Sequence, residues 1–217
     1  MDRDQVHNLI AHALEGRRLL EHPFYRRWEA GTLADGELAA YAEQYRHAER
    51  ALPEVLRTIV DSLPAGPGAD LVAANLADEE SVPEPHVELF EGFASAVSAS
   101  ASAPAGPAVA SLVDLERTTA TTDPVAALAL LAAYEVQSAE IATSKSDGLS
   151  AHYGVGSDGT RFWDVHAQME ADHADWAIEA LSLLAADPEQ VSRGARSGAD
   201  AWWAFLDERE ALAPVPA

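Results

Sequence analysis

The chain has 217 residues, no cysteine and a formal net charge of −22. This length suits one sizeable domain, and so acidic a chain is a poor partner for nucleic acid or for an anionic membrane. The lack of cysteine excludes disulfides, a thiolate nucleophile and a cysteine-bound zinc. No run of 18 apolar residues occurs and the first residues lack a signal-peptide layout, so we expect a cytoplasmic protein.

Apolar residues at helical spacing predict an all-α, single-domain bundle of about seven helices over residues 1–217, without strands. A helix over 35–63 is expected to bend or restart at Pro53, and a helix over 69–81 is interrupted at 82–85 before the segment 86–97. The other predicted helices cover 21–31, 124–145, 161–186, 188–212 and, at the start of the chain, 4–20.

Three segments rich in glycine, serine and proline are predicted as loops. They cover residues 64–68, 98–108 and 146–160. We interpret 98–108 as a flexible surface loop rather than a domain linker, because neither side of it would form a convincing core alone.

The segment "HAQMEADH" (166–173) places two histidines and a glutamate on one narrow stripe of a helix. At 100° per residue, His166, Glu170 and His173 lie at about 0°, 40° and −20°. Apolar neighbours indicate that the stripe points inward, where unpaired charge is costly and a metal would relieve that cost. The two histidines are about 10.5 Å apart along the axis, a spacing that suits two ions rather than one.

Other helices offer matching ligands. Glu79 and His86 are seven residues apart and would return to one helical face, and Glu135 is a lone carboxylate in an apolar run. Oxygen and imidazole ligands without sulfur favour iron or manganese. A ferritin-like site needs two Glu-x-x-His motifs, and this chain has one. Spacing alone leaves a dimetal site and a chance grouping of surface histidines and abundant carboxylates equally open.

The chain contains 13 arginines and a single lysine, Lys145. Such usage indicates a position that needs an amine rather than a guanidinium, although composition alone is compatible with chance.

A resemblance to a known family implies a fold and a complete set of metal ligands. The segment "HPFYRRWEAGTLADGELAAYAEQYRHAE" (22–49), "DEE" (78–80) and the final His-x-x-x-acid-x-x-His resemble the haem-oxygenase-like diiron oxidases of the TenA/PqqC-like superfamily. The resemblance covers about residues 5 to 210 and implies a haem-oxygenase-like helical bundle that binds two Fe ions or a mixed Mn/Fe pair. The ligands that it implies are Glu79, His86, Glu135, His166, Glu170 and His173.

Within that family the chain looks most like the CADD-type self-sacrificing p-aminobenzoate synthases, which serve folate biosynthesis. This resemblance implies that Tyr25 supplies the aromatic ring, Lys145 the amine and Tyr41 a radical relay. It also implies O2 as co-substrate, an external reductant and a homodimer.

The chain departs from the family pattern at two places. Glu170 stands where the family usually has aspartate, which puts the bridging of the metals in doubt. Pro83 and Pro85 lie between two of the expected ligands, and neither supports a regular helix there.

Several alternative functions remain open. The first is an oxygenase of the same fold that acts on an external amino acid or fatty acid. A TenA-like thiamin-salvage hydrolase would lack its usual cysteine nucleophile, and a PqqC-like cofactor-free oxidase would need basic substrate-binding residues that so acidic a chain hardly offers. A non-enzymatic acidic bundle, acting as a scaffold, is the last.

Overall fold

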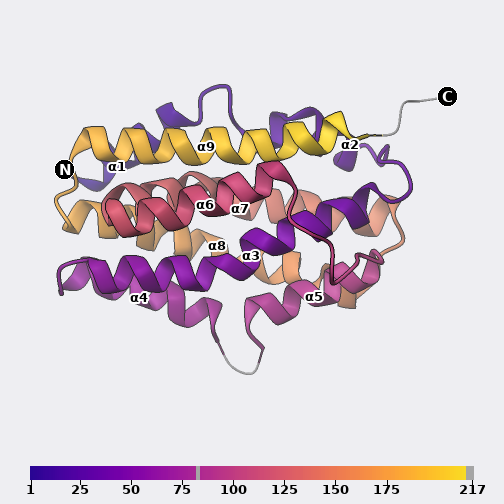
Figure 1. Ribbon diagram of the computed structural model, residues 1–217, viewed down its shortest axis with the longest axis horizontal. Coiled ribbons are helices and arrows are strands. Elements are labelled where there is room, and N and C mark those ends of the chain that lie inside the picture. The colour runs from indigo at the N-terminus through magenta and orange to yellow at the C-terminus, as the bar shows by residue number, and fades with distance from the viewer. Residues whose placement is uncertain (82–83, 214–217) are drawn as a thin grey trace.

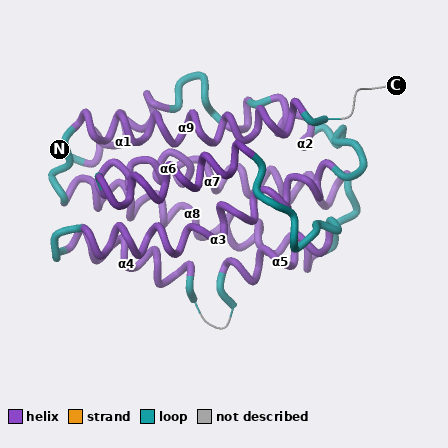
Figure 2. The backbone as a smooth tube through the Cα atoms, viewed as in Figure 1, coloured by secondary structure: helices purple, strands orange, loops and turns teal. Residues whose placement is uncertain are grey.

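The computed structural model describes residues 1–81 and 84–213, with the backbone alone at residues 170 and 171. Long helices run side by side along the longest axis of the molecule, and the described residues contain no strand (Figures 1 and 2). The elements are α1 (Arg3–Ala13), the 3-10 helix η1 (Leu19–Glu21), α2 (Pro23–Glu29), α3 (Glu37–Ser62), α4 (Pro67–Glu79), α5 (His86–Ala96), α6 (Pro107–Thr122), α7 (Pro124–His152), α8 (Ser157–Leu183) and α9 (Pro188–Ala211).

The all-α prediction is confirmed, but the described residues form nine α-helices rather than about seven. One of the two additional helices is α5, which is separate from α4 instead of continuing it after an interruption. The other is α6, for which no element was predicted. Threonine and serine lower its helix propensity. It is stabilised instead by tertiary packing of the buried residues Val109, Leu112, Val113 and Ala120, which recur at helical spacing.

The predicted boundaries were wrong at two places. The first helix ends at Ala13 instead of residue 20, because Gly16 adopts a left-handed conformation with φ 69°. The loop predicted over 146–160 is largely helical, since α7 continues to His152. Gly148 sits within this extension, where a β-carbon would lie 2.7 Å from Trp28 Cδ1. This glycine therefore permits close packing instead of ending the helix.

The helix α7 lies at the centre of the bundle and packs mainly against α8 and α9. It is the one helix of the described part of the chain that is long and apolar enough to span a membrane. However, 67% of its apolar window is buried against other helices. Its composition is therefore that of a core helix, and it places polar side chains deep inside the molecule.

Residues 97–106, between α5 and α6, are held against α3 by hydrogen bonds. Arg46 donates to the carbonyl of Ser100 at 2.6 Å, and the backbone N–H of Gly106 donates to Gln44 at 2.6 Å. The flexibility predicted for 98–108 stays a prediction.

Candidate metal centre

Five of the six expected metal ligands converge from four helices. Glu79 is the last residue of α4, His86 is the first of α5, Glu135 lies midway along α7, and His166 and His173 lie on α8. All five side chains are buried. Convergence of such polar groups in an interior indicates a site that compensates their charge.

The spacing of Glu79 and His86 predicted that they share one helical face, and this prediction was wrong. The two residues lie on different helices, because α4 ends at Glu79 and α5 begins at His86. Pro85 caps α5 in an extended conformation and so allows His86 to begin a new helix. The two side chains still meet, with His86 Nδ1 3.0 Å from Glu79 Oε2. Pro83 lies outside the described residues.

The closest group of ligands consists of Glu79, His86 and His166. One ligand atom from each lies within 4.8 Å of the other two. The rings of His86 and His166 are 4.6 Å apart. A buried set of imidazole and carboxylate donors, without sulfur, fits iron or manganese in its chemistry and its spacing.

The orientation of His166 suits metal binding. Its Nδ1 lies 2.7 Å from the carbonyl oxygen of Phe162, one turn earlier on α8. This contact selects the tautomer that donates from Nδ1 and leaves Nε2 as the electron-pair donor. Burial lowers the pKa of His166 to about 4, so the ring is neutral at physiological pH, as a metal ligand must be.

His173 is oriented by a carboxylate that the sequence analysis did not assign. Its Nε2 lies 2.7 Å from Asp78 Oδ2, and its Nδ1 lies 3.7 Å from Glu79 Oε1. In the same way the buried Asn75 donates a hydrogen bond to Glu135 at 3.0 Å. Such partners fix the direction in which a ligand presents its electron pair.

Electrostatics couples the carboxylate and the imidazoles. Burial alone would raise the pKa of Glu79, but the contact with His86 lowers it below the ordinary value. Burial likewise opposes protonation of His86, and the Glu79 carboxylate raises its pKa on balance. The side chain of Glu170 lies outside the described residues.

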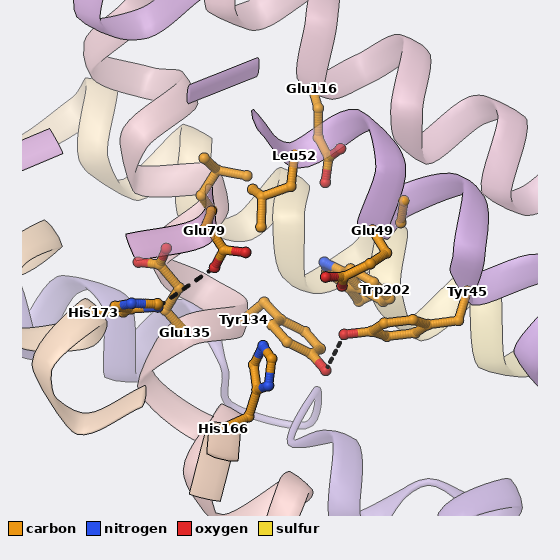
Figure 3. Close-up of a pocket in the computed structure, with 12 residues that line it drawn as sticks. Tyr45, Glu49, Leu52, Glu79, Glu116, Tyr134, Glu135, His166, His173 and Trp202 are labelled. Atoms are coloured by element: carbon orange, nitrogen blue, oxygen red, sulfur yellow. Dashed lines mark hydrogen bonds and ion pairs between the residues drawn. The ribbon is translucent and has the colours of Figure 1, made fainter. Parts of the chain in front are cut away.

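A cavity opens beside these ligands (Figure 3). Its volume of about 50 Å³ has room for a few water molecules or a diatomic gas. Most lining side chains come from α3, α7 and α8, and two of the lining carboxyl groups, Glu49 and Glu116, were not assigned by the sequence analysis. The lining residues are Tyr45, Ala48, Glu49, Leu52, Glu79, Glu116, Leu131, Tyr134, Glu135, His166, His173 and Trp202.

Tyr25, Tyr41 and Lys145, from α2, α3 and α7, form a second buried cluster. Lys145 Nζ donates to the hydroxyl of Tyr41 at 2.7 Å, and the hydroxyls of Tyr41 and Tyr25 are 2.8 Å apart. The Tyr41 oxygen accepts from the amine, and either hydroxyl of the Tyr25–Tyr41 pair can donate to the other. Burial raises the pKa of both phenols, so both are protonated.

Aromatic rings enclose the lysine. Nζ lies 3.9 Å from the centre of the Trp163 ring and 4.9 Å from that of Tyr25. Tyr41 and Tyr45 add their rings at similar distances. Cation–π attraction of this kind compensates part of the cost of burying an ammonium group.

Two further tyrosines connect this cluster with the cavity. Tyr134 precedes Glu135 on α7, and its hydroxyl is 3.0 Å from that of Tyr45 (Figure 3). The Tyr45 ring in turn stacks on Tyr41 at 5.6 Å. A series of phenols in contact therefore extends from the cavity wall to Tyr25. Neither Tyr45 nor Tyr134 was predicted, although Tyr45 lies one turn after Tyr41.

Residues 39–203 match a haem-oxygenase-like family described as iron-containing redox enzymes. The chain is 35% identical to a 4-aminobenzoate synthase from Nitrosomonas europaea, over 94% of this chain and 89% of that protein. It is 28% identical to a 4-aminobenzoate synthase from Chlamydia pneumoniae, over 91% and 92%.

Solved structures agree in fold. A TenA homologue from Pseudomonas syringae pv. tomato superposes with a TM-score of 0.78 at 16% identity, covering 96% of this chain and 92% of that one. A TenA homologue from P. horikoshii gives 0.75 at 16% identity, over 94% and 97%. The matched family and the identities over most of the chain show that this protein belongs to the haem-oxygenase-like iron-containing redox enzymes.

Proposed function

We propose that this oxidoreductase is a 4-aminobenzoate synthase that builds its product from its own Tyr25 and Lys145. The observation that carries the proposal is the hydrogen-bonded chain from the only lysine to two buried tyrosines. The relatives named 4-aminobenzoate synthase support the product. A protein that consumes its own side chains needs them in contact before the reaction begins, and these are.

The product fixes which bonds change. 4-Aminobenzoate is an aromatic ring with one carboxyl carbon and one amine, so the ring and Cβ of Tyr25 would be retained and its Cα–Cβ bond broken. The amine of Lys145 would replace the phenolic oxygen, which leaves as water. Oxidation of the Cε–Nζ bond to an imine, followed by hydrolysis, would release the aromatic amine and leave an aldehyde at Cε, and Cβ would be oxidised to the carboxylate. Dioxygen is the oxidant, and an external reductant supplies the remaining electrons.

The metal pair would be held by Glu79, His86, Glu135, His166, Glu170 and His173. When bound, two iron ions or an iron–manganese pair would supply activation of dioxygen and one-electron oxidation of a nearby phenol. The tyrosines then hold a path from the cavity to Tyr25, with Tyr41 as the relay. We also propose a homodimer, as is common for this fold.

In this scheme the remaining residues have positioning roles. The Trp163 ring and the neighbouring phenols exclude water from Lys145 and hold Nζ beside the ring that it would aminate. Tyr41 accepts a hydrogen bond from the amine and keeps Tyr25 within hydrogen-bond distance. Loss of a proton from Tyr25 on oxidation has an immediate acceptor in the Tyr41 oxygen.

The single lysine allows a selective isotope test. Protein made with lysine labelled with ¹⁵N at the ε position carries that label at Lys145 alone. After loading with Fe(II) or Mn(II) and exposure to dioxygen and reductant, we expect ¹⁵N in 4-aminobenzoate and at most about one product per chain. Unlabelled product, or many turnovers with an added amino acid or fatty acid, would instead favour the oxygenase with an external substrate.

Two variants identify the consumed residues. We expect Tyr25→Phe and Lys145→Arg to make no product while metal content stays at the wild-type level. Tyr153→Phe is the matched control, because Tyr153 is half-buried and lies outside the lysine cluster. Its hydroxyl accepts a hydrogen bond from the backbone N–H of Leu33. Product from both Tyr25→Phe and Lys145→Arg would disprove self-sacrifice.

A further inference from the structure

Glu116 lies in the wall of the metal cavity but belongs neither to the ligand set nor to the tyrosine–lysine cluster. It projects from α6, the helix that the sequence analysis missed, and its carboxyl group points into the cavity (Figure 3). Its side chain is only 4% exposed.

Among the residues that the structure describes, Glu116 has no hydrogen bond and no ion pair. A buried carboxylate without a partner is costly, and a carboxylic acid avoids most of that cost by keeping its proton. Burial accordingly raises the pKa of Glu116 to about 8, although the nearby Arg117 acts in the opposite direction. Near neutral pH the group is therefore mainly a neutral acid.

A proton explains this carboxyl group better than a further metal ion. A divalent cation needs several donors at bonding distance. In the described part of the chain, the group of donors that are mutually close enough is Glu79, His86 and His166, and it does not include Glu116. A proton needs no additional ligand.

Charge balance in the cavity points the same way. The proposed metal pair carries four positive charges, and its three carboxylate ligands contribute three negative charges. Ionised Glu49 and Glu116 would make the site anionic overall, whereas a protonated Glu116 keeps it close to neutral. The other titratable groups that line the cavity are Tyr45 and Glu49 on α3, Glu79 on α4, Tyr134 and Glu135 on α7, and His166 and His173 on α8, while α9 contributes Trp202.

We propose that Glu116 is the proton donor of the cavity and delivers its carboxyl proton to dioxygen as it is reduced there. This role rests on the proposed function. The O–H bond of Glu116 breaks, a new O–H bond forms on an oxygen atom derived from dioxygen, and no electron moves in this step. The electrons come from the external reductant and the oxidised side chains, and water from the solvent returns a proton to the carboxylate.

The test uses Glu116→Gln, which keeps the shape of the side chain but has no acidic proton. We expect metal-loaded Glu116→Gln to form 4-aminobenzoate roughly 100-fold more slowly near neutral pH. The wild-type rate should fall as pH rises through about 8, and the variant should lack this step. Asp114→Asn is the matched control, since Asp114 is an exposed acid on the same helix.

A second measurement is independent of activity. In metal-free protein the infrared C=O stretching band of protonated carboxylic acids should include a component that titrates near pH 8. This component should vanish in Glu116→Gln and persist in Asp114→Asn. Glu116→Asp should retain a titrating band and part of the rate, because a shorter acid still holds a proton.

The outcomes separate this proposal from the function on which it rests. Wild-type rates and an unchanged titration in Glu116→Gln would overturn the role of Glu116. Loss of metal in Glu116→Gln would overturn it in favour of a ligand role. If wild-type protein makes no 4-aminobenzoate while the infrared titration is as expected, the proposed function is wrong. The conclusion that the Glu116 carboxyl group holds a proton near neutral pH would still be supported.

Discussion

At the scale of single residues, Asp78 fixes which nitrogen His173 presents to the cavity. The carboxylate accepts from Nε2 at 2.7 Å and so leaves Nδ1 directed at Glu79. We expect Asp78→Asn to weaken Fe(II) or Mn(II) binding by about 10- to 100-fold, because the amide is a weaker acceptor and can rotate to offer its NH2 group. Competition with a chromogenic chelator measures this change.

The neighbouring Glu80 gives the control for that experiment. It is exposed, it caps α4 and it pairs with Arg57 at the surface. Glu80→Gln removes the same charge from nearly the same place. Equal metal affinity of Asp78→Asn and Glu80→Gln would show that the contact between Asp78 and His173 does not orient the ligand.

Residues that fit a periodic pattern could be predicted, and residues that depend on a neighbouring helix could not. The structure brings Tyr25, Tyr41 and Lys145 together, but that expectation came from resemblance to a family. Glu116 and Asn75 are single polar residues in ordinary helical sequence, and no spacing marks them as buried. Their environment is created by other helices, so it exists only in the folded chain.

At the scale of elements, two glycines set the distance between α7 and α9. A β-carbon at Gly198 would lie 2.3 Å from the carbonyl oxygen of Leu130, and one at Gly194 would lie 2.1 Å from that of Ala126. These obstacles are backbone atoms and cannot rotate away. The close approach holds α7 in place, and with it Glu135 and Lys145.

We expect Gly198→Ala to lower the free energy of unfolding by about 1–3 kcal/mol, even though alanine favours helix by about 1 kcal/mol over glycine. Urea unfolding monitored by circular dichroism measures the change. Ser197→Ala, one residue earlier on the same helix, should be nearly neutral. A Gly198→Ala protein as stable as Ser197→Ala would show that the two helices can separate without cost.

The helix boundaries differ in how well they could be predicted from the sequence. Long amphipathic stretches such as 188–212 were predicted within a few residues, because one face of the helix supplies a repeated signal. The prediction of a loop over 146–160 was wrong because the glycines and serines of this segment locally indicate a loop. Packing of Trp28 against Gly148 favours the helix instead, and this contact joins residues 120 positions apart in the chain.

At the scale of the whole molecule, the core has two parts of different composition. One cluster consists of aliphatic residues from α1, α7 and α9 and their neighbours, and contains no aromatic ring among its described members. The other contains Tyr25, Tyr41, Trp28 and further rings. On α7, Ala133 belongs to the first cluster and Ile141 to the second, so Glu135 and the cavity lie where they meet. An oxidant generated there faces oxidisable rings on one side and inert aliphatic groups on the other.

The net charge of −22 belongs to the molecule as a whole and sets its response to salt. Repulsion among surface carboxylates destabilises the compact state, and added ions screen it. Surface pairs such as Arg117 with Glu54 are weakened by the same ions, but each contributes only about 0–1 kcal/mol. We therefore expect the melting temperature of metal-free protein to rise by roughly 2–6 °C as NaCl increases from about 0.01 M to 0.15 M, where the screening length falls from about 30 Å to 8 Å.

The type of salt distinguishes screening from other effects. Sodium chloride and sodium sulfate at equal ionic strength should raise the melting temperature equally in this range if screening of repulsion is the cause. A larger rise with sulfate would indicate exclusion of the salt from the protein surface. A fall in melting temperature with either salt would mean that the surface ion pairs together outweigh the repulsion of 22 net negative charges, and the acidic surface would then be a stabilising network.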